Sequence, residues 1–446
     1  MTQPASQPVA SVRQSSPLLE VTQLETHFQT EEGTLRAVDG VSFRLDRGRT
    51  LALVGESGCG KSVTAQSLLR LVHPPGRIVG GSIRMHRSDG EPPLEVLEER
   101  ENSAALFELR GGRAALISQE ATAALSPVHT IGNQLLEAIR THQKLSKKAA
   151  SEIAREVLER VGIEDPERFW RQYPHELSGG MRQRAVIAMA LVSQPELLIA
   201  DEPTTALDVT SQAQVLILLK ELQKKFNLAI LLITHDLGVV AQMADDVAVM
   251  YLGRVVEAGP VRSILKRPRH PYTIALLESL PSLAAVGKRL PSIRGSVPAL
   301  HDVPPGCPFH PRCSYALPGR CNLGSPPPLE RFAARGAGED RSAACWRTRE
   351  VALERLMQRP TEGGPAVSPS LAPPAPSEAV ASEALPAVTA AAEDPTERIT
   401  QTAAPPFVAP RVQQATDSQT EAEWFDSKDF ESVREGPGSG GKEPAP

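Results

Sequence analysis

The sequence predicts an α/β fold in which parallel strands alternate with helices. The apolar run Thr50 to Val54 leads directly into a glycine-rich segment that begins at Gly55. A second apolar run, Leu197 to Ala200, ends in two carboxylates. Segments with apolar residues at helical spacing separate these runs, and strands that alternate with helices favour a sheet covered on both faces.

The composition limits the classes of function. The chain has 446 residues, 41% hydrophobic and 23% charged, which predicts a globular core and two or three domains. The net charge of -5 and the aromatic content of 4% argue against nucleic acid as a partner. Residues 1–17 lack the apolar core of a secretory signal, and runs such as 185–192 are shorter than the ~20 residues needed to span a bilayer. We therefore expect a soluble chain that reaches a membrane only through partners.

The first part of the chain reads as strands. Residues 1–17 are expected to be disordered, and strand-like pieces follow at 18–21, 27–28 and 41–45. Phe28 lies 27 residues before Gly55 and is a candidate to stack on a planar base; a core aromatic is the alternative.

The glycine-rich segment has the strand–loop–helix context of a phosphate-binding P-loop. It comprises Gly55, Glu56, Ser57, Gly58, Cys59, Gly60, Lys61 and Ser62, and a helix is expected to run on to about Val72. Backbone N–H groups of such a loop wrap phosphates. Lys61 is then expected to reach the β- and γ-phosphates of a nucleotide, and Ser62 to bind Mg²⁺.

Polar side chains follow three other short apolar runs. Gln119 comes after the run 114–117, Asp201 and Glu202 come after 197–200, and His235 comes after 228–233. Carboxyl ends of parallel strands meet at one edge of a sheet, where ligands bind. We expect Asp201 to serve Mg²⁺ and Gln119 to contact either Mg²⁺ or the attacking water. Glu202 is expected to orient and deprotonate that water, and His235 to contact a γ-phosphate.

Between these strands lie helices. Residues 130–176 read as an all-helical insert, and a helix is predicted from Met181 to Ser193. Ser178, Gly179 and Gly180 precede this helix, so its exposed N–H groups and positive dipole end suit an anion. Another helix is expected after Asp208, with its apolar face running to Phe226, and residues 247–257 predict a hairpin that turns at Gly253.

These motifs together resemble the ATP-binding cassette (ABC) ATPases. The match takes 55–62 as Walker A, Gln119 as the Q-loop, 177–184 as the signature, 197–202 as Walker B, 206–208 as the D-loop and His235 as the H-loop. The resemblance implies a RecA-like core, an antiparallel β subdomain and an α-helical subdomain. It also implies that ATP and Mg²⁺ lie between the P-loop of one subunit and the signature of another, with Asp208 beside the nucleotide. The helical insert is where such subunits contact membrane proteins.

A closer resemblance is to the oligopeptide/dipeptide permease ATPases (the OppD/DppD type). Residues 39–43, 270–273 and 306–313 carry it. It implies an importer ATPase on the cytoplasmic face of the inner membrane, with a sister ATPase or a second copy, two membrane permeases and a substrate-binding protein. Nickel in place of peptides, and a soluble ABC ATPase outside transport, are the alternatives. Cys59 stands where this type usually has Ser, and the segment after Gln119 is less polar than usual.

Four of the five cysteines lie beyond residue 300. Cys307, Cys313, Cys321 and Cys345 have 5, 7 and 23 residues between them, in a segment too poor in apolar residues to be held by packing alone. Four thiolates suffice for a [4Fe–4S] cluster or for Zn²⁺, and free or disulfide-bonded cysteines are the third reading. The spacing lacks the short C-x₂-C of many zinc sites. The resemblance to the permease ATPases implies the [4Fe–4S] cluster.

These observations divide the chain into four parts. They are a disordered N-terminus (1–17), an ABC ATPase domain (18–268) with its helical subdomain at about 120–178, a module with the four cysteines (269–350), and a tail (351–446). The tail is rich in Pro and Ala and is expected to be disordered because it cannot bury a core.

Overall fold

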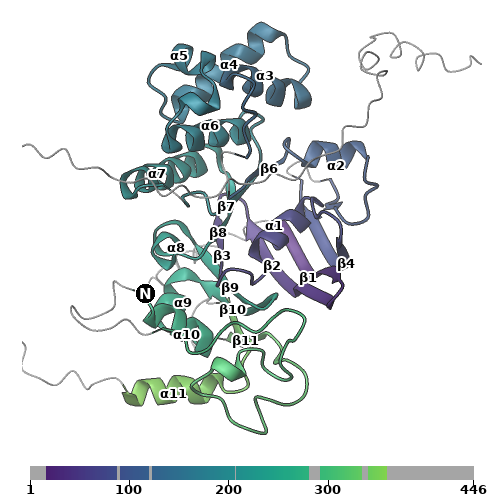
Figure 1. The fold of residues 1–446 in the computed structure, drawn as a ribbon, viewed down its shortest axis with the longest axis vertical. Helices are drawn as coiled ribbons and strands as arrows, with labels where there is room; N and C mark the ends of the chain where they lie inside the picture. The colour runs from purple at the N-terminus through teal and green to yellow at the C-terminus, as the bar shows by residue number, and fades with distance from the viewer. Residues whose placement is uncertain are drawn as a thin grey trace, which may run out of the picture. The chain divides into compact units, whose positions relative to one another are not determined.

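A computed structural model describes residues 17–358, except 88–90, 120–122, 206, 281–291 and 334–339. These described residues lie within one compact unit (Figure 1). The disorder expected at residues 1–17 and 351–446 falls mostly outside the described residues. Where the structure describes these segments the expectation is wrong, because residue 17 begins a strand and residues 351–358 belong to the helix Thr348–Gln358.

The central sheet has eight strands in the order β11-β12-β10-β9-β3-β8-β7-β6. Strands β9, β3, β8, β7 and β6 are parallel to one another, and β10 pairs antiparallel with β9 as the expected hairpin. The strands are β3 (Thr50–Val54), β6 (Ala114–Ile117), β7 (Leu197–Asp201), β8 (Ala229–Thr234), β9 (Asp246–Tyr251), β10 (Arg254–Pro260), β11 (Glu330–Ala333) and β12 (Asp340–Ala343).

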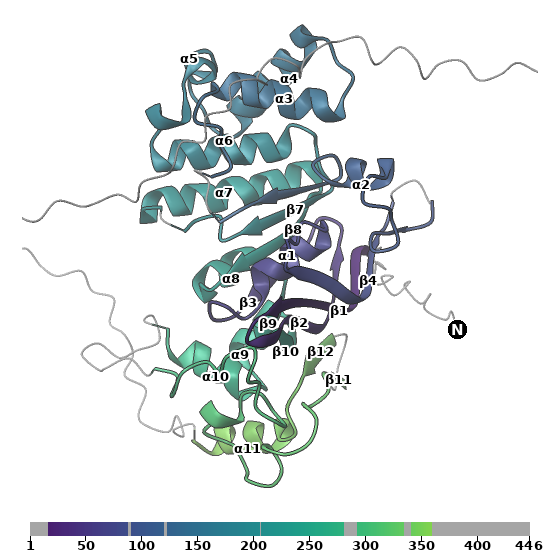
Figure 2. The same ribbon diagram turned by 45° about the vertical axis from the view of Figure 1, so that its right-hand side comes forward.

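A second, antiparallel sheet has the order β2-β1-β4-β5 and lies beside the central one (Figure 2). It consists of β1 (Pro17–Thr30), β2 (Gly33–Asp46), β4 (Gly76–Met85) and β5 (Leu94–Glu95). Apolar side chains of this sheet and of β3 belong to one core cluster. This sheet is the antiparallel β subdomain that the sequence predicts.

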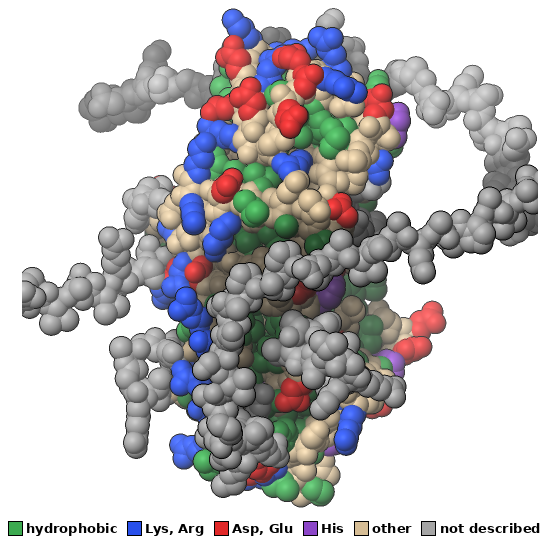
Figure 3. Space-filling model, turned by 90° about the vertical axis from the view of Figure 1, so that its left-hand side faces the viewer, with side chains coloured by type: hydrophobic (Ala, Val, Ile, Leu, Met, Phe, Trp, Pro, Cys, Tyr) green, Lys and Arg blue, Asp and Glu red, His purple; other side chains and the backbone are tan. Residues whose placement is uncertain are grey.

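Helices cover the central sheet on both faces. They are α1 (Lys61–Leu68), α2 (Ala104–Leu109), α3 (Ile131–His142), α4 (Lys147–Arg160), α5 (Pro166–Arg171), α6 (Gly179–Leu191), α7 (Val209–Phe226), α8 (Leu237–Met243), α9 (Val261–Lys266), α10 (Pro271–Glu278) and α11 (Thr348–Gln358), with short 3₁₀ turns at Pro174–Glu176 and His310–Arg312. Acidic and basic side chains are interspersed over the region of α3, α4 and α5 in Figure 3.

Strand β8 shows why these strands read as continuous apolar runs. Ile230 and Leu232 pack into the cluster formed with α3, α4, α6 and α7. Leu231 and Ile233 pack into the opposite cluster, which includes the second sheet. A strand that is buried on both faces needs apolar residues at every position, since successive side chains point to opposite faces.

The region with the four cysteines extends the central sheet. Strand β12 pairs with β10, with Glu257 opposite Ala343. Phe309 and Cys307 are buried in a cluster with Tyr251 of the cassette and with Tyr272. The sequence predicts that this segment is too poor in apolar residues to hold itself by packing, and residues of the cassette supply apolar partners to it.

Several expected boundaries also need correction. Helix α1 ends at Leu68 and not near Val72, because Arg70 takes a left-handed backbone with φ of 51°. Helix α6 begins at Gly179, two residues earlier than expected, with Ser178 as its N-cap. Phe226 is 36% exposed although the periodicity of α7 places it on the apolar face.

Among the described residues, no helix combines the length and the apolar character that crossing a bilayer requires.

The junction between β10 and β12 contains a buried ion pair. Glu257 is 1% exposed and accepts hydrogen bonds from the N–H groups of Arg269 (2.8 Å) and His270 (2.9 Å) and from Arg341 Nη2 (3.3 Å). We predict that Arg341→Met lowers the free energy of unfolding by about 3–5 kcal/mol, because it leaves the Glu257 carboxylate buried without its cation. Urea denaturation at pH 7 measures this loss.

The matched control is Arg84→Met, since Arg84 pairs with Glu95 at the surface and its side chain is 53% exposed. Its expected cost is at most about 1 kcal/mol. Equal losses for the two variants would show that the buried pair does not stabilise the junction.

Candidate functional site

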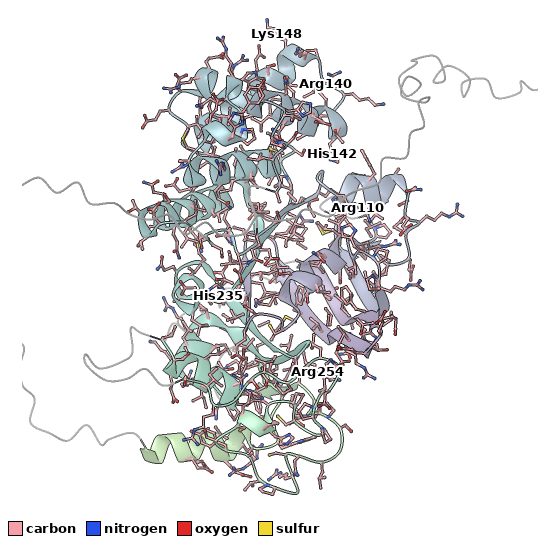
Figure 4. The ribbon with its side chains drawn as sticks, viewed as in Figure 1. Arg110, Arg140, His142, Lys148, His235 and Arg254 are labelled. Carbon is pink, nitrogen blue, oxygen red and sulfur yellow. The ribbon has the colours of Figure 1, made fainter. Side chains whose placement is uncertain are left out.

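The side chains singled out from the sequence lie at the carboxyl ends of neighbouring strands. In the order β3-β8-β7-β6, the strands are followed by Gly55, by His235, by Glu202 and by Gln119. Figure 4 shows His235 in the middle of the described structure, beside these strand ends. Four parallel neighbours therefore bring together groups that are far apart in the sequence.

The loop 55–62 has the backbone of a phosphate-binding loop. Gly58 and Gly60 take left-handed φ values of 79° and 101°, which glycine adopts without cost. A Cβ on Gly60 would lie 2.1 Å from the carbonyl oxygen of Ala37, and one on Gly55 would lie 2.3 Å from that of Met250. Both positions therefore require glycine. Gly60 is the N-cap of α1, so the loop opens directly onto the positive end of a helix.

Lys61 is folded into this loop. Its side chain is buried, and Nζ donates hydrogen bonds to the carbonyl oxygens of Gly55 (2.8 Å) and Glu56 (3.1 Å). Burial raises the pKa of the Cys59 thiol despite the nearby Lys61 ammonium. Cys59 is therefore a neutral packing residue, and it fills the position that Ser takes in the resembling family.

Glu202 is the centre of a polar cluster. Its carboxylate accepts a hydrogen bond from Thr205 Oγ1 (2.8 Å) and lies 3.1 Å from His235 Nδ1 and 3.4 Å from Gln119 Nε2. Its φ of 48° is left-handed, which turns the side chain out of the strand direction. Burial acts to raise the pKa of Glu202, but the hydrogen bonds from Thr205 and His235 outweigh it, and the pKa is lowered. The carboxylate is therefore ionised at neutral pH, as a general base must be.

Asp201 has the opposite environment. It is 7% exposed, and burial together with the charge of Glu202 raises its pKa, although a hydrogen bond from Ser62 acts against this. Its buried Oδ1 has no hydrogen-bond partner among the described residues. A buried carboxylate oxygen without a donor, next to a hydroxyl, fits a Mg²⁺ ion, which prefers oxygen ligands.

The N-terminus of α6 is open to the surroundings. Ser178 caps the helix by accepting from the N–H of Met181, and Ser178 and Gly179 are exposed. A Cβ on Gly179 would find only Leu207, at 3.8 Å. Within the described part of the chain, these N–H groups are therefore accessible to a ligand that is bound to another molecule.

Asp208 and Phe28 both contact other residues of the chain. Asp208 caps α7 through the N–H and hydroxyl of Ser211. The ring of Phe28 packs beside Gly76 at the start of β4 and is partly exposed. Contacts of both residues with a nucleotide stay predictions. Of the expected D-loop, residue 206 lies outside the described residues.

The sequence reasoning missed two residues at this site. Thr205 binds Glu202, and its position three residues after the carboxylate, behind a proline, is a local signal for a tight turn. Arg312 binds Glu56 of the loop from 256 positions away, and no sequence pattern indicates that contact.

The four cysteines line one cavity. Cys307, Cys313, Cys321 and Cys345 contribute to its wall together with His270 and other residues of the same region. Burial raises the pKa of Cys307 to about 12, and of Cys313 and Cys345 to about 11 each. These three thiols are therefore protonated at neutral pH, and binding of a metal displaces their protons. Within the described residues, no three ligating side chains are placed to hold one metal ion.

Strand order, phosphate loop and the cluster around Glu202 define a P-loop ATPase of the ABC type. Comparison with known proteins agrees. Residues 38–205 match the model of the ABC transporter family, and residues 256–321 match that of the oligopeptide/dipeptide transporter C-terminal region. The chain belongs to the family of ABC transporter ATP-binding proteins that carry this C-terminal region.

Curated relatives match over most of their length. A probable peptide ABC transporter ATP-binding protein of Sinorhizobium fredii is 49% identical over 336 residues, which cover 75% of this chain and 96% of the relative. The dipeptide transport ATP-binding protein of Bacillus subtilis is 50% identical, over 66% of this chain and 86% of its own. The oligopeptide transport ATP-binding protein of the same organism is 51% identical, over 67% and 82%.

The first prediction for this site concerns Glu202. Glu202→Gln keeps the shape of the side chain but removes the base, so we expect the kcat for ATP hydrolysis to fall at least about 100-fold while ATP still binds. Phosphate release measures kcat, and a fluorescent ATP analogue measures binding. Glu221→Gln, on the exposed face of α7, is the control and keeps full turnover. Unchanged hydrolysis in Glu202→Gln would remove Glu202 from the role of base.

The second prediction concerns the pH dependence of hydrolysis. Thr205→Val removes a hydrogen bond that lowers the pKa of Glu202, so that pKa rises. Because the base acts in its ionised form, the acidic limb of the kcat profile should move to higher pH. Thr141→Val, which removes an exposed hydroxyl of α3, serves as the control and leaves the profile in place. A shift to lower pH, or none, contradicts this account of Glu202.

Proposed function

We propose that this chain is the ATP-hydrolysing subunit of an ABC importer for dipeptides or oligopeptides. The observation that carries the proposal is the presence of both family regions in one chain, the cassette and the oligopeptide/dipeptide transporter C-terminal region. The printed names of the relatives support peptide transport, and the intact cluster at Glu202 supports hydrolysis.

The proposed reaction assigns a role to each side chain. Loop 55–62 and Lys61 bind the β- and γ-phosphates, while Ser62, Asp201 and Gln119 would hold Mg²⁺, which would supply positive charge beside the phosphates. Glu202 orients the attacking water and takes its proton, and His235 fixes the Glu202 carboxylate and faces the γ-phosphate. The short distance from His235 to Glu202 supports this pairing of roles.

The proposed assembly follows from the open N-terminus of α6. This chain has one phosphate loop and one Ser178-Gly179-Gly180 terminus, and a head-to-tail pair would place each terminus against the nucleotide of its partner. We propose a second ATPase subunit as that partner, two membrane permeases in contact with the helical region, and a substrate-binding protein outside. The chain then lies on the cytoplasmic face of the membrane as a peripheral subunit.

We further propose that the cysteine cavity holds a [4Fe–4S] cluster. In such a cluster each thiolate binds a different iron, whereas in a zinc site all ligands surround a single ion at about 2.3 Å. Four cysteines that line one cavity support this proposal, and their spacing, which lacks the short C-x₂-C of many zinc sites, favours the cluster over Zn²⁺. The cluster would stabilise a region whose apolar residues are few.

The proposed domain division keeps residues 18–268 as the cassette and residues 269–350 as the cysteine module. The matched regions support a boundary close to β10, because the second one begins at residue 256.

Purification of the tagged chain from detergent-solubilised membranes under nitrogen tests the function. Two polytopic membrane proteins and a second ATPase in the purified sample support the importer. Recovery of the chain alone favours a soluble ABC ATPase. If nickel stimulates ATP hydrolysis by the complex, nickel replaces peptides as the proposed substrate.

The prediction for the cluster uses the same sample. We expect about four irons and four acid-labile sulfides per chain, with broad visible absorbance, and their loss in Cys313→Ser. Cys59→Ser is the control, because Cys59 lies in the phosphate loop, outside this cavity. One zinc per chain, or no metal, contradicts the cluster.

A further inference from the structure

The cysteine region is joined to the phosphate loop by one ion pair. The guanidinium of Arg312 donates from Nη1 to Glu56 Oε2 (2.6 Å) and from Nη2 to Glu56 Oε1 (2.9 Å). Two parallel hydrogen bonds between a planar fork and a carboxylate fix both groups in distance and in orientation. Glu56 is the second residue of the loop, and Arg312 directly precedes Cys313.

This pair is not an ordinary surface ion pair. The side chain of Arg312 is 4% exposed, and that of Glu56 is 28% exposed. Arg312 Nε donates to the carbonyl oxygen of Arg294 (3.1 Å), and Nη1 lies 3.5 Å from Tyr251 Oη. The guanidinium also lies over the rings of Tyr251 and Phe309. Hydrogen bonds at its edges and aromatic rings at its faces therefore fix the guanidinium of Arg312 in position.

The turn that carries Arg312 is fixed as well. The N–H groups of His310, Arg312 and Cys313 donate to the carbonyl oxygens of Cys307, Phe309 and His310. The ring of Phe309 lies 5.3 Å from those of both Tyr251 and Tyr272. The guanidinium is therefore held in place by the wall of the cysteine cavity.

Both the backbone and the side chain of Glu56 are hydrogen-bonded. Its N–H donates to Tyr272 Oη (2.9 Å), and its carbonyl oxygen accepts from Lys61 Nζ (3.1 Å). Arg312 holds its carboxylate. A shift of the Glu56 carboxylate therefore moves the backbone that receives Lys61, the residue expected to meet the phosphates.

We propose that Arg312 is a positioning residue for ATP binding, which acts by holding Glu56 and thereby the start of the phosphate loop. The ion pair orders the loop before the nucleotide binds. Without the pair, part of the binding free energy would be spent on ordering the loop, and the affinity for the nucleotide would be lower. The proposal rests on the ATP-binding role of the loop, but on neither the peptide substrate nor the iron-sulfur cluster.

The test measures the Kd for ATP in the full-length chain with Glu202→Gln as background, so that ATP is not hydrolysed. Arg312→Ala should raise the Kd about tenfold, which corresponds to about 1.4 kcal/mol. Arg312→Lys keeps the positive charge but lacks the forked guanidinium, so its Kd for ATP should lie between that of the Glu202→Gln background and that of Arg312→Ala. Hydrogen exchange of the amides of residues 55–60 should be faster in Arg312→Ala.

A double-mutant cycle separates positioning from general stability. If Arg312 acts through Glu56, Arg312→Ala combined with Glu56→Gln should bind ATP as Arg312→Ala does, within about twofold. Arg320→Ala is the matched control, because Arg320 lies in the same region and pairs with the exposed Glu350. It should leave the Kd unchanged.

Either of two results overturns the proposal. One is an unchanged Kd in Arg312→Ala, and the other is full additivity in the cycle. If Arg312→Ala fails to fold, Glu56→Gln alone decides, since it breaks the same pair from the cassette side. An unchanged Kd in that variant overturns the proposal as well. An altered Kd in Arg312→Ala with no membrane partner in the purified complex would leave the positioning role intact and remove only the transport function.

Discussion

The parallel direction of β3, β8, β7 and β6 is the constraint on which the site depends. Strands that run the same way end at the same edge, so the residue after each strand meets the residues after its neighbours. Strand β3 leads into the phosphate loop, β8 is followed by His235, and β7 ends at Asp201 and is followed by Glu202. A reversed strand among them would move its polar residue to the far side of the sheet, however well the rest of the sequence matched.

Asp201 and Glu202 are adjacent in the sequence, yet the pKa values of their carboxyl groups shift in opposite directions. Asp201 ends the strand with its side chain buried, and its pKa is raised mainly by that burial. Glu202 leaves the strand with a left-handed backbone, so its carboxylate reaches Thr205 and His235, and its pKa is lowered. Neighbouring acids in environments that shift their pKa values apart are typical of sites where the two carboxyl groups have different chemical roles.

The sequence predicts the local parts of this structure well, and the reason is physical. Strands buried on both faces, the loop at Gly55 and the cap at Ser178 depend on a few adjacent residues, so their patterns are visible along the chain. The contacts of Arg312 with Glu56 and of Arg341 with Glu257 join segments that meet only after folding. Polar residues in such pairs look like surface residues in the sequence, so these contacts cannot be recognised from it.

The pairing of β12 with β10 has a consequence for shorter forms of this protein. Chains cut after residue 268 would keep the motifs for ATP but would lose the strand that covers Glu257 and Ala258 of β10. The unpaired N–H and C=O groups of that newly exposed edge strand, beside the apolar Val255 and Val256, form a template for pairing between molecules. The pairing with β12 thus leaves these β10 backbone groups unavailable to another molecule, whether or not the cysteines bind a metal.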